Sequence, residues 1–410
     1  IYFLINQLMM KKSIIWTMNI LLFIVLASCH KPIETTTDPV EPDPKEDEKE
    51  VVDTKYFPPE GDARILTGSE ANQFKLVIEK SDPKNSLELI PTPIADNEYQ
   101  VIKTFTDALV AGMNQRDKYN TIFRWITKNI SYGRNPDHGN DPFVVFNARI
   151  AVCEGYANLF KVMLLTQSIP TIVVYGMYST LGGHAWNYSF VDGAWIVGDP
   201  TNNTNNAIGD LAGYSSRLIP YRADTKFFVD NNFVYGYDKG LSVNQIKATT
   251  PIVAIPFAIN GYQISVLSLK SLIPPTVKDL YIGSNIHDLG ELGVDPSRYA
   301  PNLENIFFVQ SNTHFHTYKG VVYLQGKKTP FYVPSGKGEV WFLSTDKVVK
   351  NTLYNHQRAT IVHFGVNTKT IDNYAIESCP ALQKIYVPAS IEKIAEKAFS
   401  DVGTAQVIRY

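Results

Sequence analysis

Cysteine is scarce in this chain, and charge of one sign is not in excess. Cys29, Cys153 and Cys379 are the only cysteines among 410 residues, which is too few for a framework of disulfide bonds. The 38 Lys and Arg residues and 40 Asp and Glu residues give a formal net charge of −2. Because nucleic-acid binding needs concentrated positive charge, we expect no nucleic acid as a partner. The aromatic content of 12% suits strand-rich structure or a carbohydrate-facing surface.

The apolar run near the N-terminus, residues 14–25, is too short to span a membrane comfortably. Two lysines precede it, and LASC, which ends at Cys29, follows it. This pattern resembles the lipobox of bacterial lipoproteins, which implies cleavage before Cys29 and lipid on its thiol and amine. An ordinary signal peptide or anchor is the alternative. Residues 1–29 are therefore expected to be a signal peptide with an over-extended start before Met10, and the protein to be lipid-anchored in the bacterial cell envelope, at the outer membrane or cell surface.

Residues 30–55 are rich in Pro, Thr, Asp and Glu and have almost nothing to bury, so we expect a disordered linker. Beyond the linker, two segments carry apolar residues at the spacing of a helix. The second of them has Asp117 as its expected N-cap and Gly133 as its stop signal.

Cys153 begins a further apolar-periodic segment, CEGYANLFKVMLL, and is expected at or near the N-terminus of a helix. That end of a helix carries a partial positive charge and free N–H groups, and both favour a thiolate. The same N–H groups can stabilise an oxyanion. A cysteine at a helix start is nevertheless often a packing residue, so its function depends on what lies beside it.

The segment GGHAWNYSFVDGAWIVGDP supplies the expected neighbours of Cys153. Alternating residues predict a strand that starts at His184, a turn at Asp192-Gly193 and a returning strand that ends near Asp199. Antiparallel pairing about the turn would bring His184 close to Asp199. A carboxylate beside an imidazole orients the ring and stabilises its charged form. The three residues together predict a Cys-His-Asp site, although each alone has a plainer explanation.

These segments resemble the transglutaminase-like superfamily, in particular its peptidase-like branch related to kyphoscoliosis peptidase. The resemblance covers about residues 117–204 and rests on C-x-GYA, HAWN and DPT, together with the upstream IFRWITKNISY. It implies an α+β fold with a papain-like core, in which a helix carrying the cysteine packs on an antiparallel sheet. It also implies Cys153 as nucleophile, His184 as general base and Asp199 as the orienting acid.

Two asparagines are candidates for supporting roles. In this family an oxyanion donor can come from a side chain upstream of the cysteine, which makes Asn147 a candidate. Asn187, inside HAWN, would either hold the hairpin or act as a polar partner of His184. The transglutaminase-like domain is expected to span residues 56–260.

The remainder, residues 261–410, consists of short strand-like runs broken by Pro, Gly and Asn. Aligning Ile371 with Ile394 places IDNYAI over IAEKAF, which gives a period of roughly 23 residues. Between the repeats, paired strands are expected with turns at Lys319-Gly320 and Gly326-Lys327. The repeats resemble bacterial leucine-rich repeats of the surface-antigen type, which implies a strand-rich domain for adhesion or display.

No metal or other cofactor is expected. The loop NPDHGND lacks the acidic spacing and closing Glu of a calcium loop. His314 and His316 would share one side of a strand but have no third ligand in view. Cys379 falls where the repeat pattern calls for a small buried residue, so it is expected to be structural.

These features predict a cell-envelope lipoprotein whose Cys-His-Asp site acts on amide bonds through a thioester. Hydrolysis of a protein or peptide substrate, as by a peptidase or deamidase, is favoured over transamidation. The alternative is a catalytically inactive surface binding or adhesion protein, whose repeats bind a host protein or polysaccharide. In both cases the lipid anchor makes the membrane a partner.

Overall fold

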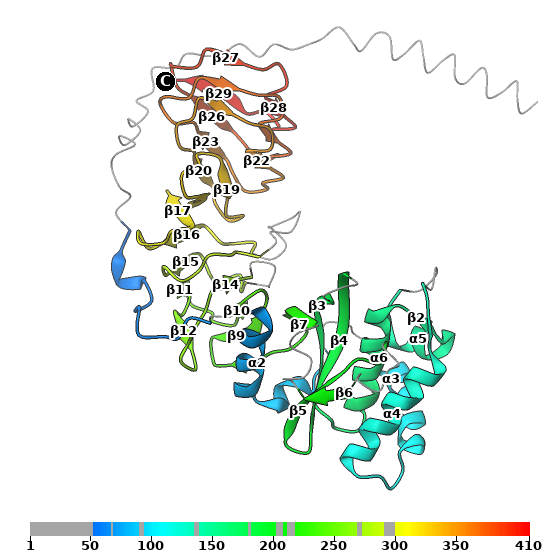
Figure 1. The fold of residues 1–410 in the computed structure, drawn as a ribbon. Helices are drawn as coiled ribbons and strands as arrows, with labels where there is room; N and C mark the ends of the chain where they lie inside the picture. The colour runs from blue at the N-terminus through cyan, green and yellow to red at the C-terminus, as the bar shows by residue number, and fades with distance from the viewer. Residues whose placement is uncertain are drawn as a thin grey trace, which may run out of the picture.

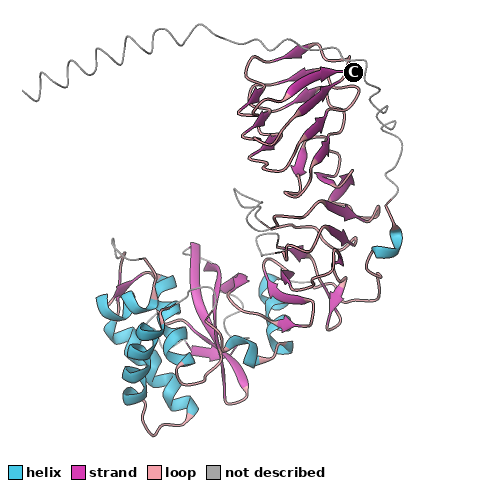
Figure 2. Ribbon diagram, turned by 180° about the vertical axis from the view of Figure 1, so that it is seen from behind, coloured by secondary structure: helices cyan, strands magenta, loops and turns pink. Residues whose placement is uncertain are grey.

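The computed structural model is described for nine stretches of the chain: residues 52–66, 69–89, 94–134, 139–178, 182–201, 208–210, 218–268, 273–290 and 300–410. The expected signal peptide, its Cys29 and nearly all of the expected linker lie outside these residues. Within them, no helix is long and apolar enough to cross a bilayer. Most helices gather at one end of an elongated molecule, and strands continue to the other end (Figures 1 and 2).

The described helices precede or adjoin the first large sheet. They are η1 (Thr54–Tyr56), α2 (Glu70–Lys80), η2 (Pro83–Ser86), α3 (Asp96–Leu109), α4 (Gln115–Asn129), α5 (Pro142–Ala148) and α6 (Cys153–Leu165). The expected N-cap of α4 was wrong. Asn114 caps the helix instead, and its Oδ1 accepts the N–H of Asp117 at 2.9 Å, so the helix starts almost one turn earlier than expected.

The helix α6 is the central element of this end of the molecule. Its residues from Gly155 to Leu165 are all buried, and it packs against α4, α5 and the sheet. A helix that is buried on every side must be enclosed by other elements. The position of Cys153, the first residue of α6, is therefore fixed by the packing of the helix.

The sheet beside α6 is antiparallel throughout and has the order β6-β5-β4-β3-β7. Its strands are β3 (Thr171–Tyr178), β4 (Gly182–Val191), β5 (Ala194–Gly198), β6 (Ile208–Asp210) and β7 (Leu218–Ala223). The turn between β4 and β5 is Asp192-Gly193, with φ of 51° and 83°, as a tight two-residue hairpin requires. The expected hairpin and the α+β class, with a helix packed on an antiparallel sheet, are confirmed.

A second group of strands lies beside β7, at the edge of this sheet. Strands β8 (Phe228–Val229), β9 (Phe233–Tyr237), β10 (Leu241–Ile246) and β14 (Val266–Leu267) form the order β14-β10-β9-β8. Two small pairs lie elsewhere: β1 (Ser131–Tyr132) with β2 (Ile150–Ala151), and β12 (Ala258–Ile259) with β13 (Tyr262–Gln263).

One apolar core joins the sheet to the strands that follow. It includes Phe74 of α2, Trp186 of β4 and Tyr235 of β9, and it continues to Leu280 and Ile306. The last two belong to a parallel ladder of β11 (Ile252–Ala254), β15 (Asp279–Ile282) and β16 (Asn305–Phe308). Because burial of apolar area is shared across these elements, the first parallel strands and the large sheet stabilise each other.

The distal strands form three parallel ladders around a second core. They are β20 (Glu339–Trp341), β23 (Ile361–His363), β26 (Lys384–Val387) and β29 (Gln406–Arg409); β21 (Lys347–Val348), β24 (Thr370–Ile371) and β27 (Lys393–Ile394); and β22 (Leu353–Tyr354), β25 (Ile376–Glu377) and β28 (Phe399–Ser400). Ile371 pairs with Ile394, and Ile376 pairs with Phe399, as the alignment predicted. The repeat architecture is therefore confirmed.

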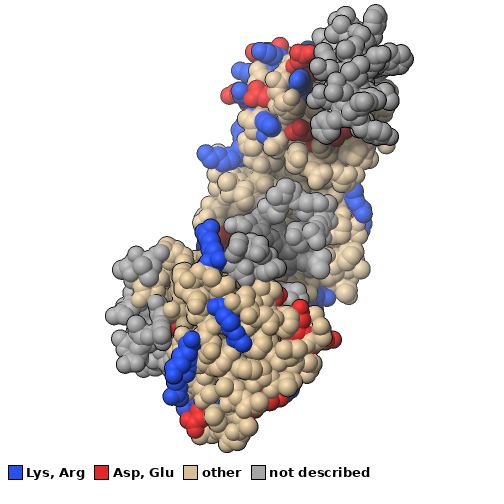
Figure 3. Space-filling model, turned by 90° about the vertical axis from the view of Figure 1, so that its right-hand side faces the viewer, with Lys and Arg blue, Asp and Glu red and all other residues tan. Residues whose placement is uncertain are grey.

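An antiparallel meander separates the two parallel regions. It consists of β17 (Phe315–Tyr318), β18 (Val321–Leu324) and β19 (Pro330–Tyr332), with the expected turn at Lys319-Gly320. Cys379 is fully buried in the distal core, as expected for a structural residue. On the face drawn in Figure 3, basic side chains lie in separate groups between wide uncharged areas.

Candidate active site

The structure places Cys153 as the first residue of α6. The preceding Val152 provides no side-chain cap, so backbone N–H groups at this helix end are available for an anion. Cys153 is partly exposed. Burial by itself raises the pKa of its thiol, but hydrogen bonds from His184 and from the backbone N–H groups of Ala185 and Glu154, with the charge of His184, bring the pKa below its ordinary value.

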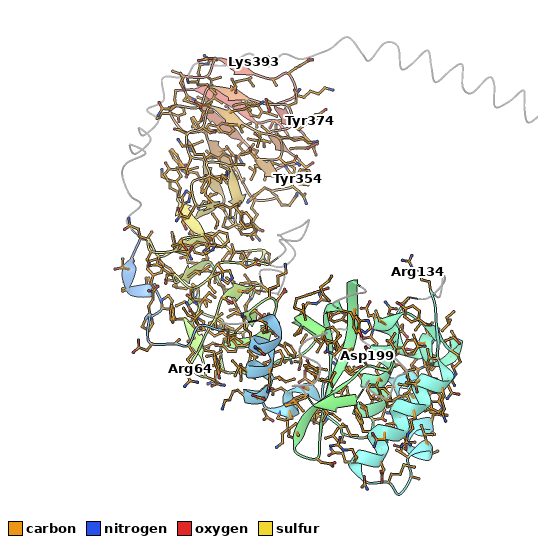
Figure 4. The ribbon with its side chains drawn as sticks, in the orientation of Figure 1. Arg64, Arg134, Asp199, Tyr354, Tyr374 and Lys393 are labelled. Atoms are coloured by element: carbon orange, nitrogen blue, oxygen red, sulfur yellow. The ribbon has the colours of Figure 1, made fainter. Side chains whose placement is uncertain are left out.

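His184 and Asp199 are brought together by the β4–β5 hairpin. Asn187 pairs with Gly198, so Asp199 follows β5 at the level of the open end of β4, where His184 lies. Their Nε2 and Oδ2 atoms are 2.8 Å apart, and the two side chains are 11% and 1% exposed. The other carboxylate oxygen, Oδ1, accepts the backbone N–H of Thr201 at 3.2 Å. Asp199, labelled in Figure 4, is thus fixed where the sheet meets the helices.

Aromatic rings fix the orientation of the imidazole. The ring of Trp186, which is fully buried, stacks on His184 with centroids 6.0 Å apart and planes 21° apart. Tyr178 packs edge-on at 5.8 Å. With Nε2 directed at Asp199, the other ring nitrogen, Nδ1, is left to face the thiol. The imidazole can therefore bridge thiol and carboxylate without turning.

The electrostatics favour a thiolate–imidazolium pair. Burial lowers the pKa of His184, but the hydrogen bonds and charges of Asp199 and Cys153 outweigh it and raise the pKa to about 9. The thiol pKa moves in the opposite direction. A thiolate is the nucleophilic form of cysteine, and an adjacent imidazolium can donate a proton. The arrangement is therefore able to carry out acyl transfer.

The two supporting asparagines lie elsewhere than expected. Asn147 is exposed on α5, and its Nδ2 donates to the carbonyl of Phe143 at 3.0 Å. It therefore faces its own helix rather than the thiol. Asn187 is fully buried, and its Nδ2 donates to the carbonyls of Ala157 at 3.0 Å and Ile172 at 3.3 Å. It connects α6 to β3, and neither the hairpin nor His184 receives these bonds.

A hydrogen-bond network beside the thiol, centred on Glu154, could not be predicted from the sequence. The carboxylate of Glu154, the residue after Cys153, accepts a hydrogen bond from Asn140 Nδ2 at 2.7 Å and one from the Tyr175 hydroxyl at 3.4 Å. Tyr175 and Cys153 also pack against one small apolar cluster of Ala157, Val173 and Ala185. Only the position of Glu154 next to Cys153 is a sequence signal for this network.

Potential metal ligands do not converge in the described part of the chain: no three His, Cys, Asp or Glu side chains there could hold an ion. His314 is exposed, and His316 stacks on Tyr323 with ring centroids 5.3 Å apart. The loop once compared with a calcium site falls partly on residues 135–138, outside the described residues. Cys29 lies outside them as well.

A helix that presents a cysteine to a His-Asp pair on an antiparallel sheet defines the papain-like class. Residues 103–200 match the family model of the transglutaminase-like superfamily. The chain therefore carries a transglutaminase-like domain, as the motifs around Cys153, His184 and Asp199 predicted.

Solved structures of both kinds of domain are similar to parts of this chain. A candidate cysteine protease from Cytophaga hutchinsonii shows 20% identity over 35% of this chain and 52% of its own, with a TM-score of 0.26. The periplasmic domain of TgpA from Pseudomonas aeruginosa shows 19% identity over 30% of this chain and 51% of its own, with a TM-score of 0.25. A leucine-rich repeat protein from Bacteroides ovatus shows 15% identity over 45% of this chain and 53% of its own, with a TM-score of 0.28.

The matched region spans about half the length of each of these three structures. No curated protein matches this chain significantly.

Proposed function

We propose that Cys153 attacks the carbonyl carbon of an amide in a protein or peptide substrate and forms a thioester. The observation that carries this proposal is the hydrogen-bonded series of Cys153, His184 and Asp199 within a transglutaminase-like domain. The lowered thiol pKa and the raised imidazole pKa support a reactive ion pair.

In the first step the Cys153 sulfur bonds to the carbonyl carbon, and negative charge develops on the carbonyl oxygen. Backbone N–H groups at the start of α6 are suited to stabilise that oxygen. The imidazolium of His184 donates its proton to the amide nitrogen, the C–N bond breaks and the amine leaves. Asp199 keeps the ring oriented and stabilises its positive charge.

In the second step a water oxygen attacks the thioester carbon while neutral His184 accepts a proton from that water. The C–S bond then breaks, an acid leaves, and the thiolate–imidazolium pair is restored. Water is the acceptor that we propose, because a site exposed outside the cell meets it in abundance. The lipobox-like LASC, which ends at Cys29, supports a cell-envelope location on a lipid anchor.

The test uses casein together with dansylcadaverine, and compares the wild type with Cys153→Ala. New N-termini identify a peptidase, and ammonia release without cadaverine incorporation identifies a deamidase; both agree with hydrolysis. Incorporation of dansylcadaverine as the dominant product would show that an amine is the acceptor. Equal yields from wild type and Cys153→Ala would exclude Cys153 as the nucleophile for this substrate.

A binding function for the repeats is proposed alongside the chemistry. A hollow of about 530 Å³ is bordered by Lys347, Lys350 and Lys393, and only the first of these has a carboxylate partner within the described residues, Asp372 at 3.0 Å. Lys393 is labelled near the far end of the repeats in Figure 4. This excess of positive charge supports an acidic polysaccharide as ligand. Binding of polygalacturonate should weaken in Lys393→Glu without any change in Cys153 alkylation.

A further inference from the structure

A second hollow, of about 320 Å³, opens at the outer edge of the large sheet. Its walls come from β3 and β7 of that sheet and from β9 and β10 of the neighbouring one. The residues that matter here are Tyr175, Arg222, Asp224, Lys226 and Asn244. The hollow therefore combines an aromatic wall with several charged and amide groups.

Tyr175 connects this hollow to the thiol. Its neighbours in the sheet are Ala185 of β4 on one side and Arg222 of β7 on the other. Paired residues in antiparallel strands direct their side chains to the same face, so Arg222 and Tyr175 share the face that α6 covers. Tyr175 packs on the cluster that also contacts Cys153, and its hydroxyl donates to Glu154. One tyrosine ring thus separates the thiol from the hollow.

Arg222 lies against the far side of that ring. Its guanidinium carbon is 4.5 Å from the centroid of Tyr175, as in a cation–π contact. Arg222 is exposed, and no carboxylate partner of its guanidinium is found in the described part of the chain. The ring fixes the guanidinium plane, while its N–H donors remain available to a ligand.

Two other charged residues that line the hollow form ion pairs. Lys226 pairs with Glu88 at 2.6 Å. Asp224 is buried and pairs with Lys161 at 2.7 Å, and its second oxygen accepts the N–H of Val173. Within the described residues, Arg222 is the cation of this hollow that forms no ion pair. The nearby acidic groups are the Glu154 carboxylate at the Tyr175 hydroxyl and Asp238, which forms an isolated β-bridge with Arg222.

Asn244 contributes an amide to the lining of the hollow, and its Nδ2 packs over Gly236 of β9. Its Oδ1 accepts the Ser242 hydroxyl at 2.7 Å, which fixes Nδ2 as the donating end of the amide. A carboxylate accepts both guanidinium and amide N–H groups, and a planar guanidinium fits it in two-point fashion.

We infer that this hollow is a substrate subsite for a carboxylate carried close to the attacked carbonyl, with Arg222 as its counter-ion. The inference rests on the proposed function, since it assumes that the substrate carbonyl is brought to Cys153. The carboxylate is either an acidic side chain beside the attacked bond or a chain-terminal carboxylate. Both present the same chemistry to Arg222.

The experiment compares alkylation of Cys153 in the full chain by three matched probes. They are N-iodoacetyl-glutamic acid α-amide, N-iodoacetyl-glutamine α-amide, and N-iodoacetyl-glutamine with a free α-carboxylate. The second-order rate constant of each is divided by that of iodoacetamide, and mass spectrometry assigns the label to Cys153. We expect at least one carboxylate probe to react about fivefold faster than the neutral one, the size of one exposed ion pair. The faster of the two identifies the source of the carboxylate.

Arg222→Gln should remove this preference, which is measured in each variant as the ratio to its own iodoacetamide rate. Arg64→Gln is the matched control, because it removes the same charge at a site far from Asp199 (Figure 4). Equal rates for charged and neutral probes in the wild type would overturn the inference, as would an equal loss in the Arg64 variant. If iodoacetamide alkylates Cys153 no faster than free cysteine, the proposed nucleophile fails, while the ratio of charged to neutral probes still reports on the hollow.

Discussion

The Nε2 atom of His184 lies 2.8 Å from Oδ2 of Asp199, although fifteen positions separate the residues in sequence. The hairpin turn at Asp192-Gly193 creates this proximity, and Trp186 holds the imidazole plane. The contact keeps one ring nitrogen for the carboxylate and the other for the thiol. It therefore links the ionisation of Cys153 to a carboxylate that the thiol need not touch.

Replacement of Cys153 by Ala should abolish alkylation by iodoacetamide at pH 6. The pKa of the Cys153 thiol lies below its ordinary value, whereas burial raises the pKa of the Cys379 thiol to about 11. Peptide mapping after a short exposure should find the label on Cys153 and not on the fully buried Cys379. Comparable labelling of both cysteines in the wild type would contradict a selectively activated thiol.

Asp199→Asn should raise the apparent pKa of the Cys153 thiol and slow its alkylation at pH 6 by roughly tenfold, which corresponds to one pKa unit. The variant keeps the shape of the side chain but removes the charge that stabilises the imidazolium of His184. The pH dependence of the alkylation rate measures the change. Asp192→Asn is the matched control, since Asp192 is half-exposed at the hairpin turn and pairs with Arg116. An identical shift in both variants would show that the effect is not local.

Stability should depend on pH through His184. Its pKa in the folded chain is about 9, above the ordinary value of 6.5. The stabilisation by its protonated form is therefore complete below about pH 6.5 and is lost as the pH rises through 9. Cys153 has the opposite effect on the pH dependence of stability, because its pKa is lowered in the folded chain. The stabilisation by its thiolate is complete above the ordinary thiol pKa and is lost as the pH falls through the folded-state pKa.

Urea unfolding of the wild type and of His184→Gln, each at pH 6.5 and pH 9.5, separates the histidine contribution. The free-energy difference between the two proteins should be larger at pH 6.5. A difference that is constant or grows at pH 9.5 would refute the raised histidine pKa.

Replacement of only one partner of the buried Lys161–Asp224 ion pair should lower the free energy of unfolding. Lys161→Met leaves an unpaired carboxylate at a site where burial already raises the pKa of Asp224 to about 7 despite its partner. We expect a loss of about 3 kcal/mol in the free energy of unfolding. The double variant with Asp224→Asn keeps an acceptor for the Val173 N–H and should recover most of that loss. Additive losses in the double variant would argue against the pair as the cause.

The relative positions of Cys153, His184 and Asp199 could be predicted because each signal is local in sequence. Helical periodicity locates Cys153 at the start of α6, and a two-residue turn fixes the register that brings His184 to Asp199. The repeat alignment succeeds for a similar reason, since successive turns of a parallel ladder repeat the same contacts, as in Ile371 and Ile394.

The contacts of three other side chains could not be predicted. They depend on side-chain orientation or on the pairing of strands that are far apart in sequence. Spacing gives no indication that Asn147 would bond back to Phe143 on the exposed side of α5. Asn187 lies in the expected strand, but its face of that strand meets α6 and not the imidazole. Arg222 reaches the site because β7 pairs with β3 at the outer edge of the sheet, a strand order that no local pattern contains.

The apolar core that runs unbroken from Phe74 through Trp186 to Ile306 has a consequence for reach. Within the described residues, this core packs the large sheet and the first parallel strands into one body. The distance between the Cys153 thiol and that part of the repeats is therefore fixed by packing. A substrate that bound to those strands would meet the proposed nucleophile, Cys153, only across the separation that this shared packing sets.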